Sequence, residues 1–171
     1  LIDCKAKLLF VSDGFYRKGK NISQKQIAQN AIIDTSIEKL IVVPYKGIDN
    51  YDSTEKIIFY DQLVSSQNNL CTTEILDSED PLFILYTSGT TGTPKGVVHA
   101  HGGFSVFAGH QSAYLIDTHE NDILFWPADI GWITGLVWNV YGMLLMGASA
   151  VIYDGALEFP NYDRIWSMLS E

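Results

Sequence analysis

Residues 86–96 read Tyr-Thr-Ser-Gly-Thr-Thr-Gly-Thr-Pro-Lys-Gly and follow directly on a short apolar run, residues 82–86. Glycine tolerates positive φ and lets the backbone approach a ligand closely, and consecutive backbone N–H groups in such a turn form an anion-binding concavity. The hydroxyl groups add hydrogen-bond donors, and Lys95 adds a mobile positive charge. This combination predicts a polyphosphate-binding loop at the end of a buried strand. The alternative is an ordinary hydroxyl-rich surface loop.

The loop departs from the Walker A pattern of P-loop nucleotidases. That pattern is Gly-x-x-x-x-Gly-Lys followed by Ser or Thr, whose hydroxyl holds Mg²⁺. If the pattern began at Gly89, its second glycine would fall on Pro94, and Lys95 is followed by Gly96 rather than by a hydroxyl residue. The sequence therefore disfavours a P-loop NTPase. That class stays an alternative, and an absence of γ-phosphate hydrolysis would exclude it.

Apolar runs and helical patterns alternate on both sides of the loop. Continuous apolar runs predict buried strands at residues 8–11, 39–44, 82–86, 122–125 and 150–153. Helical spacing predicts helices at residues 27–32 (with Ser23 as N-cap), 57–66, 102–114, 134–145 and from 162 onward. This alternation predicts an α/β fold whose mostly parallel sheet layers are covered by helices.

The composition is that of a globular protein with an acidic surface. The chain has 171 residues, of which 47% are hydrophobic and 18% charged, and this excludes a disordered tail. Each long apolar stretch is broken by polar residues, so no membrane-spanning helix is expected. The net charge of −9 argues against a nucleic-acid partner, because such proteins neutralise phosphates with basic side chains.

The cysteines and histidines suggest neither disulfides nor a metal centre. Two cysteines, Cys4 and Cys71, make neither a disulfide framework nor a zinc site, so a reduced, cytoplasmic location is expected. The four histidines include His99 and His101, and their spacing along a strand or helix does not bring three ligands together. We therefore predict no metal-ligating residues within the chain.

The loop resembles the phosphate-loop signature of the adenylate-forming (AMP-binding) superfamily, which includes acyl-CoA synthetases, adenylation domains and luciferases. The family pattern is [Tyr/Phe]-Thr-Ser-Gly-[Ser/Thr]-Thr-Gly-x-Pro-Lys-Gly, and residues 86–96 meet it. The resemblance implies that a carboxylate attacks the α-phosphate of ATP to give an acyl-adenylate and pyrophosphate, and that a thiol then displaces AMP. It implies Lys95 as a catalytic residue, and as ATP phosphate-binding residues Thr87, Ser88, Gly89, Thr90, Thr91, Gly92 and Lys95.

Other stretches are most similar to short-chain acyl-CoA synthetases of the acetyl-CoA synthetase kind. These stretches are residues 79–85, 97–103 (similar to the start of the helix after the loop), 125–135 and 153–166. The resemblance implies that Ile133 lines the acyl pocket and that Thr134 contacts CoA. Glu158 takes a position near CoA that is usually Asn in the family.

A basic turn near the beginning of the chain is similar to the stretch by which acetyl-CoA synthetases bind the phosphorylated nucleotide end of CoA. It comprises Arg17, Lys18, Gly19 and Lys20. Lysine stands at two of the places where the family has Arg-Ala-Gly-Arg, and where lysine replaces arginine it keeps the charge but loses the bidentate fork. The alternative is a solvated basic turn.

The resemblance implies an ATP-dependent acyl-CoA synthetase, an acid–thiol ligase that activates a short-chain carboxylate such as acetate. Its substrates would be the small acid, ATP and CoA, with Mg²⁺ held by a residue outside this chain. The family's later motifs are missing, so residues 1–171 are expected to be an internal portion of the N-terminal AMP-binding domain, without the C-terminal lid domain and inactive alone. The alternatives are a non-catalytic nucleotide- or CoA-binding module and a propionyl- or acetoacetyl-CoA synthetase.

Overall fold

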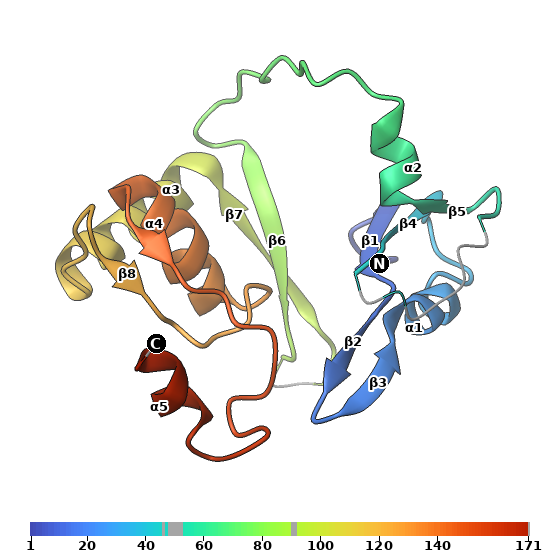
Figure 1. Ribbon diagram of the computed structural model, residues 1–171. Helices are drawn as coiled ribbons and strands as arrows, with labels where there is room; N and C mark the ends of the chain where they lie inside the picture. The colour runs from blue at the N-terminus through green and yellow to red at the C-terminus, as the bar shows by residue number, and fades with distance from the viewer. Residues whose placement is uncertain (46, 48–52, 90–91, 171) are drawn as a thin grey trace. The chain divides into compact units, whose positions relative to one another are not determined.

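The computed structural model describes residues 1–45, 47, 53–89 and 92–170. The chain divides into two compact units. Unit 1 comprises Leu1–Thr72 and Gly155–Glu171, and unit 2 comprises Thr73–Asp154. In Figure 1 unit 1 therefore contains both the blue N-terminal part of the ribbon and the red C-terminal helix.

Unit 1 is built on a three-stranded parallel sheet with strand order β1-β4-β5. These strands are β1 (Leu8–Ser12), β4 (Lys39–Val43) and β5 (Ile57–Phe59). The helices of the unit are α1 (Gln24–Ala31), α2 (Tyr60–Ser65) and α5 (Arg164–Leu169). Strand β4 lies in the middle, so its Leu40 and Val42 are fully buried and pack with Ala28 and Ile32 from the region of α1.

Helix α1 begins where the sequence predicts it to begin. The Ser23 side chain accepts a hydrogen bond from the backbone N–H of Gln26, which satisfies a donor that the first helical turn leaves unpaired. Between β1 and α1 the chain forms an antiparallel hairpin of β2 (Gly14–Arg17) and β3 (Lys20–Ser23). This hairpin carries the basic turn.

Asp13 attaches the base of this hairpin to the parallel sheet. Its side chain is buried, one carboxylate oxygen accepts hydrogen bonds from the N–H groups of Gly14 (2.8 Å) and Tyr45 (3.1 Å), and the other accepts one from Gly47 (2.8 Å). Its backbone N–H donates to the carbonyl of Val43, at the end of β4. One buried carboxylate therefore connects the ends of β1 and β4 to the hairpin.

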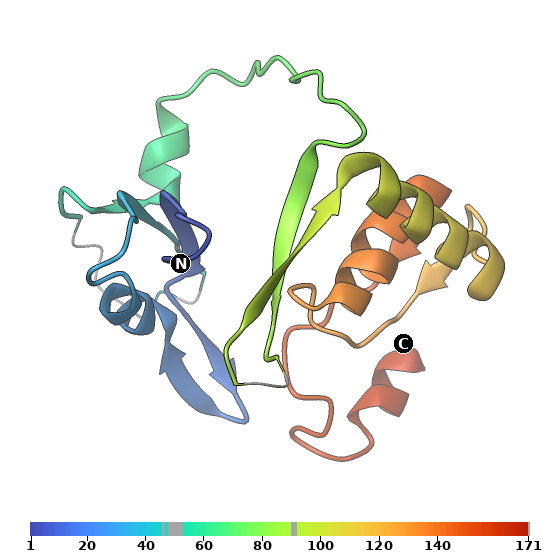
Figure 2. The same ribbon diagram turned by 180° about the vertical axis from the view of Figure 1, so that it is seen from behind.

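Unit 2 begins with an antiparallel pair, β6 (Pro81–Thr87) and β7 (Lys95–Ala100). It continues with α3 (His101–His110), the π-helical turn η1 (Gln111–Leu115), β8 (Ile123–Leu124), the π-helix η2 (Gly135–Gly142), α4 (Met143–Met146) and β9 (Ser149–Ala150), which pairs with β8 in parallel. Helices α3 and η2 lie side by side (Figure 2). Their core is aromatic: the ring of Phe104 meets those of Phe83 and Tyr141 edge-on, with centroids 4.7 and 4.9 Å apart.

The predicted α/β class is confirmed, with parallel pairing in the β1-β4-β5 sheet and in β8-β9. Two antiparallel pairs, β2-β3 and β6-β7, are additional. The similarity of residues 97–103 to the start of a helix was misleading, because Lys95–Ala100 is a strand and α3 begins at His101. The helix predicted at residues 57–66 begins only at Tyr60, because Ile57 and Phe59 are buried in β5 beside β4.

Within the part of the chain that the structure describes, none of the helices has the length and apolar content needed to cross a bilayer.

Candidate functional site

The predicted phosphate loop connects the two strands of the β6–β7 hairpin. Thr87, the last residue of β6, pairs directly with Lys95, the first residue of β7, so residues 88–94 form the loop. Directly opposed residues of an antiparallel pair project to the same face, with β-carbons about 4.5–5.5 Å apart. The hydroxyl of Thr87 and the ammonium group of Lys95 therefore project from the two ends of the loop on one face, and both residues are exposed.

Two glycines shape the described part of this loop. Gly89 has φ +63° and Gly92 has φ +82°, a region that residues with a side chain rarely adopt. A β-carbon at Gly89 would also lie 2.5 Å from the carbonyl oxygen of Thr93, so the backbone is folded back on itself there. Thr90 and Thr91, also predicted to bind phosphate, lie outside the described residues. The chemistry and tight turn of the described part fit an anionic phosphate group.

A second loop of unit 2, residues 125–132, leads into Ile133 and Thr134, which are helical and run directly into η2. The Asp129 side chain accepts a hydrogen bond from the N–H of Gly131 (2.7 Å), which closes a tight turn within the loop. Ile133 is half-buried and packs against the cluster that contains Phe104 and Val137. Leu82 and Phe83 of β6 pack against the same cluster, so Ile133 shares its apolar surroundings with the strand that leads into the phosphate loop.

Helix η2 fixes this second loop through two residues that the sequence reading did not identify. The buried Asn139 donates from its amide nitrogen to the carbonyl oxygens of Trp126 (2.8 Å) and Ala128 (3.4 Å). A β-carbon at Gly135 would overlap the carbonyl of Asp129, so only glycine allows the helix to lie so close. A polar residue in the middle of an apolar run was the available signal for Asn139.

Thr134 stands directly before η2, and its side chain makes no capping hydrogen bond to that helix. Its predicted role at CoA therefore stays a prediction.

The basic turn is the tip of the β2–β3 hairpin in unit 1. Arg17 pairs with Lys20, and between them Lys18 (φ +49°) and Gly19 (φ +76°) form the two-residue connection. Positive φ at both central residues is the signature of the type I′ turn, which matches the twist of the flanking strands. The structure thereby places three exposed cations around one tight turn.

Glu158 lies at this tip. Its carboxylate forms an ion pair with the Lys18 ammonium group at 2.5 Å. The hydrogen bond from Lys18 lowers the pKa of Glu158, with smaller contributions from its own backbone N–H and from the charges of Lys18 and Arg17. Four predicted CoA residues and Glu158, about 140 positions later in the sequence, therefore form one cluster in unit 1, whereas Thr134 belongs to unit 2.

Among residues 1–45, 47, 53–89 and 92–170, no three histidine, cysteine, aspartate or glutamate side chains gather as a metal site.

A protein-family model described as "AMP-binding enzyme" matches residues 1–171. The chain belongs to the AMP-binding enzyme family. This confirms the resemblance that the phosphate loop carries.

The chain is similar to curated acetyl-coenzyme A synthetases and to a solved acetoacetyl-CoA synthetase. The chain is 46% identical over 170 residues to an acetyl-coenzyme A synthetase of Methanothrix thermoacetophila, with 99% of this chain and 26% of that protein covered. It is 40% identical over 174 residues to the acetyl-coenzyme A synthetase of Helicobacter pylori strain G27, with the same coverage. The structure is similar to acetoacetyl-CoA synthetase from Streptomyces lividans, with a TM-score of 0.81 and 27% identity over 95% of this chain and 24% of that one. The chain thus spans about a quarter of these relatives, and the last similarity supports the α/β fold.

Proposed function

We propose that residues 1–171 are an internal portion of the N-terminal AMP-binding domain of an ATP-dependent acyl-CoA synthetase. The C-terminal lid domain would lie outside this chain. The enzyme joins a short-chain carboxylate such as acetate to CoA through an acyl-adenylate. The observation that carries the proposal is the β6–β7 hairpin, whose loop turns tightly at Gly89 and places Lys95 opposite Thr87. The 46% identity to an acetyl-coenzyme A synthetase supports the choice of branch.

In the adenylation step, a carboxylate oxygen attacks the α-phosphorus of ATP and the bond to the β-phosphate breaks. Negative charge then develops on the departing pyrophosphate. The Lys95 ammonium group and the hydroxyls of Thr87 and Ser88 stand on or beside the loop, where they can donate hydrogen bonds to the β and γ oxygens. Preorganised donors that meet charge as it develops are an effective source of catalysis.

In the second step, the CoA thiol attacks the acyl carbonyl and AMP leaves. Ile133 would limit the acyl pocket, and Thr134 would contact CoA close to the reacting acyl group. The tip formed by residues 17–20 would bind the phosphorylated nucleotide end of CoA. A metal ion would accompany ATP, and we propose that its protein ligand lies outside this chain.

A longer or functionalised acid remains the second candidate, because the structure is similar to an acetoacetyl-CoA synthetase. The higher identity to acetyl-coenzyme A synthetases favours the simple short acids. We place the enzyme in the cytoplasm, a proposal supported by two unpaired cysteines, Cys4 and Cys71.

Product analysis of the complete protein that contains this chain tests the proposal. With ATP, Mg²⁺, CoA and acetate it should form acetyl-CoA and one AMP for each thioester. ADP or inorganic phosphate formed without any acid would instead indicate a nucleotidase. Tight binding of ATP or CoA without product would indicate the non-catalytic module.

A further inference from the structure

An anionic residue lies inside the cluster that is proposed to bind an anionic ligand. Glu158 contacts Lys18 at 2.5 Å, and both side chains are about half exposed (46% and 53%). The charge of Arg17 also acts on this carboxylate. Of the cations at the hairpin tip, at least Lys18 therefore has a carboxylate partner before any ligand binds.

Local structure holds Glu158 in this place. The N–H of Phe159 donates to the carbonyl of Ala156 (3.0 Å), so residues 156–159 form a turn. The ring of Phe159 lies beside Gly19, where an added β-carbon would meet it at 3.6 Å. The contact between this turn and the hairpin tip thus involves an aromatic ring as well as the ion pair.

We propose that Glu158 is an internal competitor of the coenzyme: its carboxylate occupies Lys18, and a phosphate monoester of CoA must displace it to bind the hairpin tip. This inference rests on the proposed function, because it takes the tip as a CoA subsite. It makes Glu158 a residue that sets affinity for the phosphorylated end of CoA.

The competition follows from charge and exposure. The Glu158 carboxylate is ionised at neutral pH, and the hydrogen bond from Lys18, which lowers the pKa of Glu158, favours the ionised form further, so the carboxylate stays paired with Lys18. A phosphate monoester carries about −1.5 to −2 charges and three acceptor oxygens, so it can replace a single carboxylate among three cations. Exposed ion pairs are weak and are screened by salt, so little free energy is needed to replace the Glu158 carboxylate by a phosphate group at Lys18.

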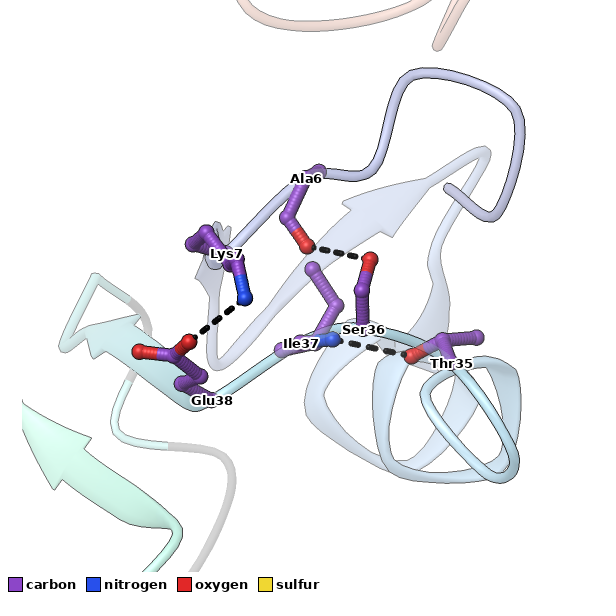
Figure 3. A network of polar contacts seen from close by, with 6 residues as sticks. All are labelled: Ala6, Lys7, Thr35, Ser36, Ile37 and Glu38. Atoms are coloured by element: carbon purple, nitrogen blue, oxygen red, sulfur yellow. Dashed lines mark hydrogen bonds and ion pairs between the residues drawn. The ribbon is translucent and has the colours of Figure 1, made fainter.

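The test compares Glu158→Gln with a matched control in the complete protein. Glutamine keeps the shape of the side chain and removes its charge. The control is Glu38→Gln, because Glu38 also forms an exposed ion pair, with Lys7 at 2.7 Å (Figure 3), whose side chains are 63% and 62% exposed. That pair lies at the amino ends of β1 and β4, whereas the β2–β3 hairpin leaves the carboxyl end of β1. Both variants change the net charge equally.

Binding of adenosine 3′,5′-bisphosphate, measured by calorimetry, and the KM for CoA are the two readouts. Glu158→Gln should tighten bisphosphate binding and lower the KM for CoA by about two- to fivefold, the range set by exposed ion pairs. The effect should shrink in high salt and be smaller for dephospho-CoA, which lacks the 3′-phosphate. Glu38→Gln should change neither readout.

Unchanged or weaker bisphosphate binding in Glu158→Gln would overturn the inference, because the carboxylate would then either have no effect on ligand binding or favour it. An equal gain in Glu38→Gln would also overturn it, since net charge alone would explain the result. A triple variant, Arg17→Ala with Lys18→Ala and Lys20→Ala, tests the CoA role of the hairpin tip separately from the competition by Glu158. If it leaves CoA binding unchanged, the CoA role of the tip itself is wrong; if it weakens binding while Glu158→Gln has no effect, only the competition is wrong.

Discussion

Lys95 should act in one half-reaction far more than in the other. Pyrophosphate is present only during adenylation, so Lys95→Ala should slow that step by about 10–100-fold, the value of one charge-assisted hydrogen bond, and leave thioester formation nearly unchanged. Pyrophosphate exchange, compared with CoA transfer from a supplied acyl-adenylate, measures the two steps separately. Lys95→Arg retains the charge and should recover part of the loss. Equal losses in both steps would contradict the role assigned to Lys95.

The two glycines of the phosphate loop should differ in their tolerance of a side chain. Both have positive φ, but a β-carbon at Gly89 would press on the Thr93 carbonyl, whereas among the residues that the structure describes nothing lies within 4 Å of one at Gly92. Gly89→Ala should therefore raise the KM for ATP by about tenfold or more, equivalent to at least ~1.4 kcal/mol of distortion. Gly92→Ala introduces backbone strain alone and should raise the KM for ATP less. A comparison of the two KM values checks this, and the reverse order would mean that the turn at Gly89 does not shape the phosphate site.

Ile133 should help to limit acyl length. Ile133→Ala removes three carbon groups, so kcat/KM for butyrate or hexanoate should rise relative to acetate, by at most about 10–200-fold. Ile130→Ala is the control in the same loop, because Ile130 is 47% exposed. The measurement is the profile of kcat/KM across acetate, propionate, butyrate and hexanoate. A profile with unchanged shape would place Ile133 outside the pocket.

At the level of elements, Asp13 should determine how firmly the β2–β3 hairpin is held. Asp13→Ala leaves the N–H groups of Gly14, Tyr45 and Gly47 without this acceptor, at a cost of about 2–3 kcal/mol. Amide hydrogen exchange at Gly14 and Tyr45 should accelerate by about 30–150-fold, which corresponds to that free energy. Asp61→Ala, an exposed carboxylate on α2, should leave those two amides unchanged. Equal protection in both variants would show that the hairpin does not depend on Asp13.

The sequence predicted elements well where the pattern was local. The predicted strand at residues 39–44 corresponds to β4 (Lys39–Val43), and Ser23 caps α1, because burial and capping act within a few residues. The pairing of β7 with β6 was not predictable in this way. Val97 and Val98 favour a strand. The strand forms because it pairs with β6 on the other side of the loop. The resemblance instead predicts the start of a helix in this stretch.

The candidate functional residues also differ in whether their partners are near or distant in the sequence. The glycines, hydroxyls and Lys95 of the phosphate loop are consecutive, so their chemistry is visible in the sequence. The ion pair of Lys18 with Glu158 and the hold of Asn139 on the carbonyl of Trp126 depend on the fold, because their partners are distant in sequence. The sequence therefore suggests which chemical groups the candidate site contains, while the structure shows which residues hold the neighbouring loop and hairpin in place.

At the scale of the whole molecule, the proposed function requires that a carboxylate be activated at the α-phosphate of ATP. The reaction that isolates this step is the exchange of labelled pyrophosphate into ATP by the complete protein, with Mg²⁺ present and CoA absent. Exchange should depend on a short acid, be strongest with acetate or propionate, and fall in Lys95→Ala. Exchange that is absent with every acid tested, or that proceeds equally without any acid, would contradict the proposed function.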